Sequence, residues 1–154
     1  MDCWSEQGIR EGDLMELVRE RLAAGFRVQS LTFRGVSMMP MLRQGKDSVD
    51  LAPVTGKLKK YDLPVYHAAS GKYLMHRVVG FDGEHYVCLG DNTLNYEYIE
   101  PEQMIGVVTA FTRGHRKISV TDPAYRLYCR FWYLIFPVRR FARIAGYKIG
   151  RLLK

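Results

Sequence analysis

The chain has 154 residues, of which 47% are hydrophobic and 25% are charged, and its formal net charge is +7. A chain of this length buries roughly two thirds of its unfolded surface, so we expect a single core that needs neither disulfides nor a structural metal. The three cysteines, Cys3, Cys88 and Cys129, are an odd number with no CxxC pair. This pattern argues against a disulfide framework and a thiolate zinc site, and we expect free thiols.

The positive charge is confined to the last part of the chain. Residues 121–154 contain eight Lys or Arg side chains and one acidic side chain, Asp122, for a net charge of +7. The preceding 120 residues carry 15 basic and 15 acidic side chains and are neutral. The body of the protein therefore gives no charge-based reason to bind nucleic acid, which is not expected as a partner.

The N-terminal segment, residues 1–27, predicts a short amphipathic helix over about 13–24. Asp13 is expected to be its N-cap, and Gly25 stands where the helix should stop. The segment is charged throughout and lacks the apolar h-region of a signal peptide, and no stretch approaches the ~20 apolar residues of a spanning helix. We therefore expect a cytoplasmic or peripheral-membrane protein. The apolar residues at helical spacing are Leu14, Met15, Leu17, Val18 and Leu22.

The middle segment, residues 28–120, predicts an antiparallel β domain. Its short runs rich in β-branched and aromatic residues are VQSLTF, LPVYHA, YLMHRVVGF, HYVCLG, MIGVVTAF and RKISV. Tight hairpin turns are expected at 69–72 (ASGK) and 82–85 (DGEH). Strands this short and numerous tend to close into a barrel-like or folded sheet, so the expected fold class is mainly β (α+β).

The segment 121–154 predicts a basic, aromatic helical tail. Asp122 and Pro123 fit an N-cap and a first helical residue, and Pro137 is expected to kink or end the first helix. Helical spacing separates apolar from basic side chains: Tyr128, Trp132 and Ile135 from Arg126 and Arg130, then Phe141, Ile144, Ala145, Tyr147 and Ile149 from Arg140, Arg143 and Lys148.

This tail is typical of an interfacial membrane helix, because Lys and Arg lie on one side and aromatic residues on the other. An anionic membrane surface is therefore the expected partner of residues 122–154. The alternatives for the tail are docking to a partner protein, packing of the aromatic face on the chain's own domain, and binding of RNA or DNA.

Two side chains of the middle segment are candidates for nucleophilic chemistry. Ser37 lies in the stretch GVSMMPML, where Pro40 forbids both a ladder hydrogen bond and a regular helix, so a bent backbone is expected. His76 shares a strand face with Leu74 and Val78, which predicts a histidine in apolar surroundings that can act as a general base. The alternatives are an ordinary polar residue at a strand end for Ser37 and a core histidine bonded to a carbonyl for His76.

Three sequence boxes here resemble those of the S24/S26 group of serine peptidases, and within it the type I signal peptidases. Their nucleophile box, Ser-Met-x-Pro followed by Leu and Gly-Asp, is similar to SMMPMLRQGKD; their base box is similar to MHRVVG; their Gly-Asp-Asn box is matched by GDNTLNYE. The order agrees, with His76 39 residues after Ser37 and Asp91 a further 15 residues on. The resemblance covers about residues 28–113 and implies a signal-peptidase/LexA-like folded β-sheet or barrel-like domain.

The resemblance implies acyl transfer by a serine and a histidine. Ser37 would attack a peptide carbonyl, His76 would accept its proton and return it, and an acid would orient the imidazole. Lysine is the base in most bacterial signal peptidases and in LexA-type repressors, whereas the endoplasmic-reticulum and archaeal type uses histidine, which His76 matches. Lys72 lies four residues upstream, ~13 Å along an extended strand, and is not expected to replace His76.

Two carboxylates are candidates for the acid that orients His76. Asp91 stands in the Gly-Asp-Asn box, although such a box also forms an Asx turn in any protein. Glu97 occupies the place where the histidine branch often has a second aspartate. We expect Asp91 to fill the catalytic or structural role near the site, because the longer carboxylate of Glu97 must reposition to reach the same nitrogen.

The resemblance also implies an oxyanion hole and a peptide groove near Gly35, Met38, Met39 and Pro40. The family often has a serine two residues before the nucleophile, whose hydroxyl helps to bind the oxyanion, but this chain has Gly35 there. The hole is therefore expected to depend on backbone N–H groups, including that of Ser37. Neither a cofactor nor a metal is implied.

The sequence thus predicts a serine endopeptidase of the signal-peptidase-like group that cleaves leader or precursor peptides. The family usually has a membrane-spanning helix before the nucleophile and this chain is expected to have a soluble amphipathic one, so the usual substrate, a translocated signal peptide, stays open. One alternative is a catalytically weak or inactive module that binds an extended peptide by strand addition. Another is a repressor-type protein that cleaves itself, with Ala24–Gly25 as the candidate bond.

Overall fold

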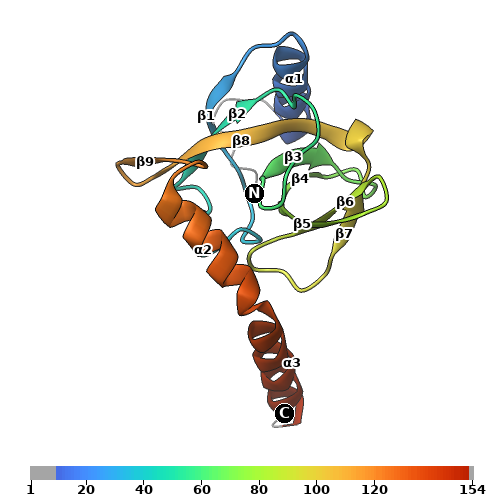
Figure 1. Ribbon diagram of the computed structural model, residues 1–154, viewed down its shortest axis with the longest axis vertical. Helices are drawn as coiled ribbons and strands as arrows, with labels where there is room; N and C mark the ends of the chain where they lie inside the picture. Colours follow the sequence, from blue (N-terminus) through green and yellow to red (C-terminus); the bar gives the residue numbers. More distant parts are fainter. Residues whose placement is uncertain (1–9, 153–154) are drawn as a thin grey trace.

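The computed structural model describes residues 10–152. It shows an antiparallel β body that one helix precedes in the sequence and two helices follow (Figure 1). Helix α1 (Glu11–Ala23) comes first, and α2 (Pro123–Leu134) and α3 (Phe136–Leu152) come last. The strands between them are β1 (Val28–Thr32), β2 (Ser48–Ala52), β3 (Pro64–His67), β4 (Tyr73–Met75), β5 (Arg77–Asp82), β6 (His85–Leu89), β7 (Glu97–Ile99), β8 (Met104–Arg113) and β9 (Arg116–Ser119). A short 3₁₀ helix, η2 (Pro101–Gln103), precedes β8. Cys3 lies outside the described residues.

The strands form two antiparallel sheets. The larger sheet has the order β1-β2-β8-β3-β4, with β9 paired to β8 beside this path, and the smaller sheet has the order β5-β6-β7. Strand β8, ten residues long, pairs with β2, β3 and β9 and so holds the larger sheet together. The larger sheet curls into a half-barrel (Figure 1), which confirms the expected folded antiparallel sheet.

The chain passes from the larger sheet to the smaller one at a single residue, His76, and it returns to the larger sheet through residues 100–103. Strand β4 ends at Met75 and pairs with β3, whereas β5 begins at Arg77 and pairs with β6. The prediction of one strand over 73–81 is therefore wrong, because the chain changes pairing partners in the middle of that run. Both expected hairpin turns are confirmed, as the β3–β4 and β5–β6 connections.

Two strands, β2 and β7, were not expected from the sequence. Strand β2 has the sequence SVDLA, and the buried carboxylate of Asp50 accepts a hydrogen bond from the Ser30 N–H at 3.0 Å and pairs with Lys117. An acidic residue at the centre of a run removes the apolar alternation by which strands are identified. Strand β7 has three residues, which is too short for a period of two to be recognised.

The main core lies between α1, the larger sheet and α2. Its buried members include Met15, Val18 and Leu22 of α1, Leu51 and Val65 of the sheet, and Tyr125 and Cys129 of α2. A second cluster, around Tyr66, Val78 and Cys88, draws side chains from both sheets. Burying an aliphatic side chain of this kind stabilises the fold by about 1.5–3 kcal/mol. The described parts of the three segments expected from the sequence, 1–27, 28–120 and 121–154, thus contribute to one core.

The start of α1 differs from the expectation, and its end agrees with it. The residue before the helix is Arg10, while Asp13 lies inside the first turn and pairs with Arg10 at 3.0 Å, so Asp13 is not the N-cap. Gly25 follows the last turn with a φ of +86°, in the left-handed region that glycine favours, and its N–H donates to the Leu22 carbonyl.

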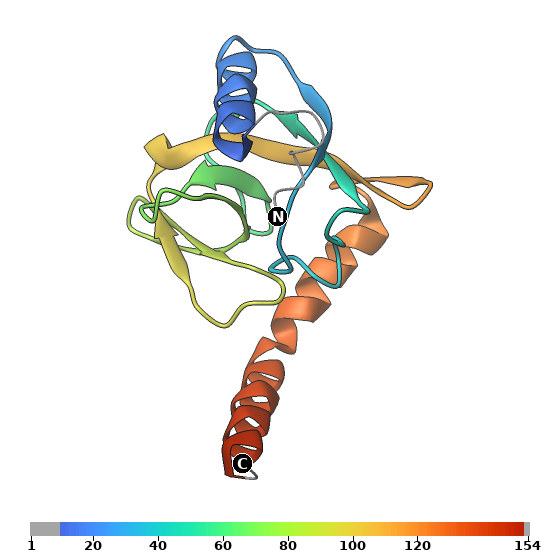
Figure 2. The same ribbon diagram turned by 180° about the vertical axis from the view of Figure 1, so that it is seen from behind.

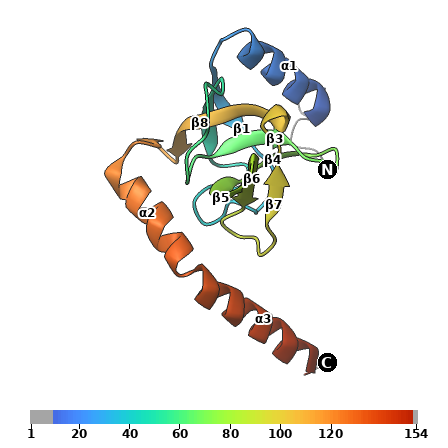
Figure 3. The ribbon, with the colours of Figure 1, turned by 45° about the vertical axis from the view of Figure 1, so that its right-hand side comes forward.

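The two C-terminal helices form an arm that begins on the body and extends beyond it. Asp122 is confirmed as the N-cap of α2, because its carboxylate accepts the Ala124 N–H at 2.8 Å. The helix breaks at Ile135, and Pro137 lies in the first turn of α3, as expected. Helix α2 lies against the body and α3 projects past it (Figure 3), far from α1 at the opposite end (Figure 2). Within residues 10–152, no helix has both the length and the apolar character needed to cross a bilayer.

Candidate active site

Ser37 lies in a compact turn of the loop that joins β1 to β2. The Met39 N–H donates to the Val36 carbonyl at 3.1 Å and the Leu42 N–H donates to the Met38 carbonyl at 3.0 Å, so the bent backbone expected for GVSMMPML is confirmed. The Ser37 carbonyl accepts the N–H of Asn92 at 2.7 Å. The nucleophile box and the Gly-Asp-Asn box are therefore in direct contact.

The backbone conformation of this turn favours glycine at position 35. Its φ is +105°, where a residue with a Cβ is strained, although a Cβ would meet no atom within 4 Å. A serine at position 35 would therefore need a different backbone from the one observed. The departure from the family pattern follows from the path of the loop.

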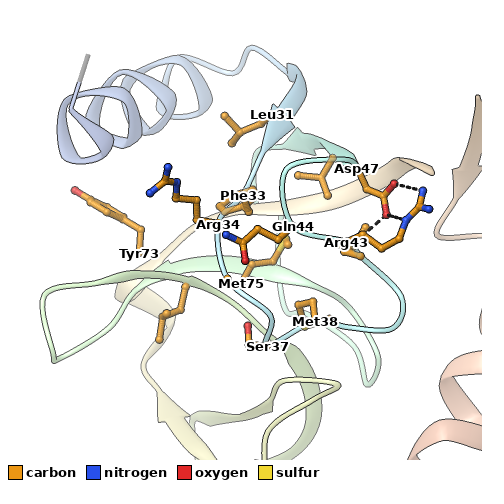
Figure 4. Close-up of a pocket in the computed structure, with 14 residues that line it drawn as sticks. Leu31, Phe33, Arg34, Ser37, Met38, Arg43, Gln44, Asp47, Tyr73 and Met75 are labelled. Carbon is orange, nitrogen blue, oxygen red and sulfur yellow. Dashed lines mark hydrogen bonds and ion pairs between the residues drawn. The ribbon is translucent and has the colours of Figure 1, made fainter. Parts of the chain in front are cut away.

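A pocket opens between the end of β1 and strand β4, and Ser37 lies at its edge. Figure 4 shows the Ser37 hydroxyl pointing toward the other lining residues, which include Leu31, Phe33, Tyr73 and Met75. The opposite wall carries an ion pair in which Arg43 contacts Asp47 at 2.7 Å.

The four residues expected to form the groove are divided by the structure. Gly35 and the buried Met38 line the pocket. Met39 and Pro40 are exposed and lie outside its lining. The side chains of Phe33 and Met75 supply apolar wall instead, and neither was expected from the sequence.

His76 is buried between the two sheets and is held by a carboxylate. Its Nδ1 lies 2.6 Å from Glu97 Oε2 and 3.0 Å from the Tyr66 hydroxyl, which in turn donates to the same Glu97 oxygen. Burial raises the pKa of Glu97, but hydrogen bonds from His76 and Tyr66 outweigh burial and hold the pKa below its usual value. Glu97 is therefore a carboxylate at neutral pH, able to accept the Nδ1–H of His76.

The other ring nitrogen of His76, Nε2, is not engaged by another described residue. Nε2 is buried and makes no hydrogen bond within the described part of the chain. A Cβ built on Gly90 would lie 3.0 Å from His76 Cδ2, the ring carbon next to Nε2, and 2.8 Å from the Ser37 carbonyl oxygen. The two residues therefore approach each other across Gly90, and only a glycine fits between them.

Asp91 pairs with Arg77 and not with His76. Its carboxylate forms a buried ion pair with Arg77, with Nε to Oδ1 at 3.1 Å, and both side chains are fully buried. The same carboxylate accepts the hydroxyls of Tyr128 and Tyr133 from α2. Of the catalytic or structural role expected for Asp91, the structure shows the structural one, because Asp91 fastens α2 to the body. Glu97, the carboxylate expected to be less suited to His76, contacts the imidazole.

The C-terminal arm also holds the backbone of the Gly-Asp-Asn box. Arg139 donates to the Asp91 carbonyl, and the Arg143 guanidinium donates to the Asn92 carbonyl at 2.7 Å and to the Asn92 side chain. Because the Asn92 N–H donates to the Ser37 carbonyl, the arm is connected through a single residue to the turn that contains Ser37.

Two residues at the site, Tyr66 and Arg77, were missed from the sequence. Tyr66 lies in a short, largely apolar strand, so its sequence context indicates a core residue and not a hydrogen-bond donor. Its partner, Glu97, is 31 residues away in the sequence. Arg77 matches the basic residue of MHRVVG, but its burial is not apparent from that motif, because its counter-ion comes 14 residues later.

Other chemistry near the site has less support. Lys72 is exposed in the β3–β4 turn, whereas His76 is buried beside Glu97. Burial raises the pKa of the Cys88 thiol to about 12, so it is protonated and a poor nucleophile at neutral pH. Among residues 10–152, no cluster of three or more His, Cys, Asp or Glu side chains is arranged to hold a metal ion.

Comparisons of this chain with models of protein families, with curated proteins and with solved structures found no match.

Proposed function

We propose that this chain is a serine endopeptidase of the signal-peptidase-like group that cleaves leader or precursor peptides, with Ser37 as nucleophile and His76 as general base. The observation that carries the proposal is the environment of His76, whose Nδ1 bonds Glu97 while its buried Nε2 has no partner among the described residues. The His76 ring and the Ser37 backbone both lie next to Gly90. The three-box resemblance to the S24/S26 peptidases supports the same two roles. The half-barrel is accordingly proposed to be a form of the signal-peptidase/LexA-like fold.

In the proposed reaction, Ser37 Oγ attacks the carbonyl carbon of the substrate peptide bond while its proton passes to His76 Nε2. The tetrahedral intermediate then collapses, the C–N bond breaks, and His76 gives the proton to the leaving amine. Water hydrolyses the resulting acyl ester, with His76 accepting the proton of the attacking water and returning a proton to Ser37 Oγ. Glu97 accepts the Nδ1–H throughout, which keeps the lone pair at Nε2 and stabilises the imidazolium.

The proposed reaction requires a hydrogen bond between the Ser37 hydroxyl and His76 Nε2 in the substrate complex, and Nε2 has no other partner among the described residues. Catalytic hydrogen bonds are often long or unmade in free enzymes and form in the substrate complex. Backbone N–H groups of the 35–38 turn are proposed to bind the oxyanion, since Gly35 supplies no hydroxyl.

The pocket beside Ser37 suits an extended peptide. Strands β1 and β4 stand at the two ends of the sheet order, and the pocket lies between them. A substrate segment can add to the free edge of such a strand through backbone hydrogen bonds, with its side chains alternating into the groove. Leu31, Phe33 and Met75 make part of the wall apolar, which favours apolar substrate side chains.

Self-cleavage at Ala24–Gly25 has less support. The bond lies in the hydrogen-bonded end of α1, where the Ala24 N–H donates to the Glu20 carbonyl and the Phe26 N–H donates to the Arg21 carbonyl, both at 3.0 Å. A peptidase binds its scissile bond in an extended conformation, so this helix end would have to unwind first. A module that binds peptides without cutting them is the second candidate, because His76 and Ser37 share no hydrogen bond in the free protein.

A library of peptides prepared from a digested proteome tests the proposal, because it offers the chain many different sequences at once. We expect the wild-type chain to create new peptide termini, read by mass spectrometry, and Ser37→Ala and His76→Ala to create none. Replacement of the exposed Ser70 by Ala is the matched control and should retain the same cleavage pattern. Identical peptide profiles with wild type and Ser37→Ala would leave only the peptide-binding module.

A further inference from the structure

The C-terminal arm carries a continuous apolar face that no described residue covers. It consists of Leu127, Phe131, Leu134, Val138 and Phe141, which we call the tail stripe. These side chains recur at intervals of three and four residues across the break between α2 and α3, so they follow one side of the arm. Each is between 56% and 78% exposed, an unusual amount of apolar surface for one face.

The tail stripe is not the face by which the arm binds the body. Tyr125 and Cys129 are buried in the main core, and the indole of Trp132 donates to the Asp91 carbonyl at 2.9 Å. Tyr128 stacks on Trp132, with ring centroids 5.7 Å apart. The face expected to meet the membrane consisted of Tyr128, Trp132 and Ile135. Two of these residues, Tyr128 and Trp132, contact the chain's own domain instead, so the uncovered face of the arm is a different one.

Basic side chains from two separate elements lie alongside the tail stripe. A groove between the 59–62 loop and α2 is lined by Lys59, Lys60, Arg126 and Arg130, and we call these four the basic groove. Its one acidic lining residue, Asp62, uses its carboxylate to accept the Lys59 N–H at 2.7 Å. Lys60 and Arg130 also line the neighbouring hollow formed with Leu127, Phe131 and Leu134, so charge and apolar surface adjoin.

We infer that the tail stripe and the basic groove together bind the surface of an anionic lipid bilayer. Apolar side chains on one face of a helix enter the boundary between headgroups and acyl chains, and basic groups beside them hold anionic headgroups. A second protein chain would cover the stripe equally well, but it gives no reason for four basic side chains at the edge with one acid among them. The inference concerns binding and holds whether or not the chain is a peptidase.

The test uses the full chain, because deletion of 122–154 would uncover the buried Arg77 and Asp91. Sedimentation is measured with vesicles of phosphatidylcholine alone and with vesicles containing about one third phosphatidylserine. We expect wild type to bind the anionic vesicles at least about tenfold more tightly than the neutral ones. The difference should shrink when salt rises from about 0.1 M to about 0.5 M, since salt screens exposed charges.

Three variants separate the two parts of the surface from general stickiness. The stripe variant Phe131→Ser/Val138→Ser/Phe141→Ser should lose at least about tenfold in affinity, because it removes the inserting side chains. The groove variant Arg126→Gln/Arg130→Gln should lose about 25-fold in affinity for anionic vesicles, because each of the two charges is worth roughly fivefold. The control Leu17→Ser/Phe26→Ser changes exposed apolar residues at the other end of the molecule and should bind as wild type does.

Several results would overturn the inference. They are equal binding to neutral and anionic vesicles, wild-type binding by the stripe variant, or no binding by the wild type to either composition. A wild-type dimer in lipid-free buffer that the stripe variant converts to a monomer, seen by sedimentation velocity, would assign the stripe to a second copy of the chain. Near-ultraviolet circular dichroism of each variant checks that these exposed substitutions leave the fold intact.

Discussion

At the scale of single residues, two carboxylates near the candidate site have different tasks. Glu97 bonds Nδ1 of His76, whereas Asp91 pairs with Arg77 and with two tyrosines of the arm. The first contact orients a side chain with a free nitrogen, and the second joins two parts of the fold. Removing the charge of Glu97 and removing the charge of Asp91 should therefore impair different properties, catalysis in the first case and stability in the second.

Replacing Glu97 by Gln should impair catalysis more than stability. The amide oxygen can still accept the Nδ1–H, but the charge that stabilises the imidazolium is lost, so we expect acylation of Ser37 to slow at least about 100-fold. The measurement is the rate of labelling by a serine-directed probe, with thermal unfolding recorded beside it. The exposed Glu84→Gln is the control and should label as wild type does. Wild-type labelling by the Glu97→Gln variant would remove Glu97 from the site.

Replacing Asp91 by Asn should impair stability first. It leaves the Arg77 guanidinium buried without its counter-ion, and breaking a buried ion pair on one side costs about 3–5 kcal/mol. Urea unfolding measures this loss, and the exposed Asp82→Asn should change the free energy of unfolding by less than about 0.5 kcal/mol. A loss below about 1 kcal/mol for Asp91→Asn would contradict the structural role given to the pair.

The roles of Ser37 and His76 could be proposed from short motifs, but the choice between Asp91 and Glu97 could not. That choice depends on the β6–β7 hairpin, in which Glu97 lies opposite Cys88 and so beside His76. Strand β7 is too short to be recognised from its sequence, and without it the register that directs Glu97 inward is unknown. Only the argument that the longer side chain of Glu97 is less suited to reach His76 was wrong.

At the scale of secondary-structure elements, the arm is connected to the turn that contains Ser37. Arg143 binds Asn92, and Asn92 donates to the Ser37 carbonyl. Any change in how α3 lies on the body can thus alter the position of Ser37. If the arm binds a bilayer, this contact would transmit that event to the candidate site.

Arg143→Ala should loosen the Asn92 turn. We expect faster hydrogen exchange at the Asn92 N–H and roughly tenfold slower probe acylation of Ser37, because the turn loses a charge-assisted hydrogen bond, which is worth about 1.5–3 kcal/mol. The neighbouring exposed Arg140→Ala is the matched control and should leave both quantities unchanged. Equal effects of the two substitutions would mean that only the overall charge of α3 matters.

Most elements could be predicted from periodicity, and the failures share a cause. The run 73–81 has the composition of a strand throughout, yet it divides at His76 because its two halves join different sheets. Which sheet each half joins depends on tertiary contacts and not on local sequence. The amphipathic tail was expected to be helical, and it is. Which of its faces meets the body depends on Asp91 and Arg77, and their distant partners cannot be read from the spacing of the tail itself.

At the scale of the whole molecule, three carboxylates make stability depend on pH. The pKa of Asp47 is lowered chiefly by its hydrogen bond with Arg43, and contacts outweigh burial to lower those of Asp50 and Glu97. A carboxyl group whose pKa is lower in the folded state stabilises the fold above its unfolded pKa, about 3.9 for Asp and about 4.3 for Glu. That stabilisation is lost as the pH falls through the folded values.

These three groups should therefore leave the urea midpoint nearly constant between about pH 7 and about pH 5. They should lower it as the pH drops below about 4. Urea titrations followed by tryptophan fluorescence measure the midpoint. In Asp47→Asn the fall should be smaller, because one of the three groups no longer titrates. A midpoint that is unchanged down to about pH 3 would contradict the lowered pKa values.

The central claim is that Ser37 is a nucleophile activated by His76, and acylation of the folded protein tests it most directly. The wild-type chain, Ser37→Ala and His76→Ala are each incubated with an activated peptide ester that acylates reactive serines, and adducts are located by intact-mass and peptide-mapping mass spectrometry. We predict one adduct on Ser37 in the wild type, none at that position in Ser37→Ala, and labelling at least about 100-fold slower in His76→Ala. Equal labelling of all three proteins, or an adduct at another residue in the wild type, would contradict the claim.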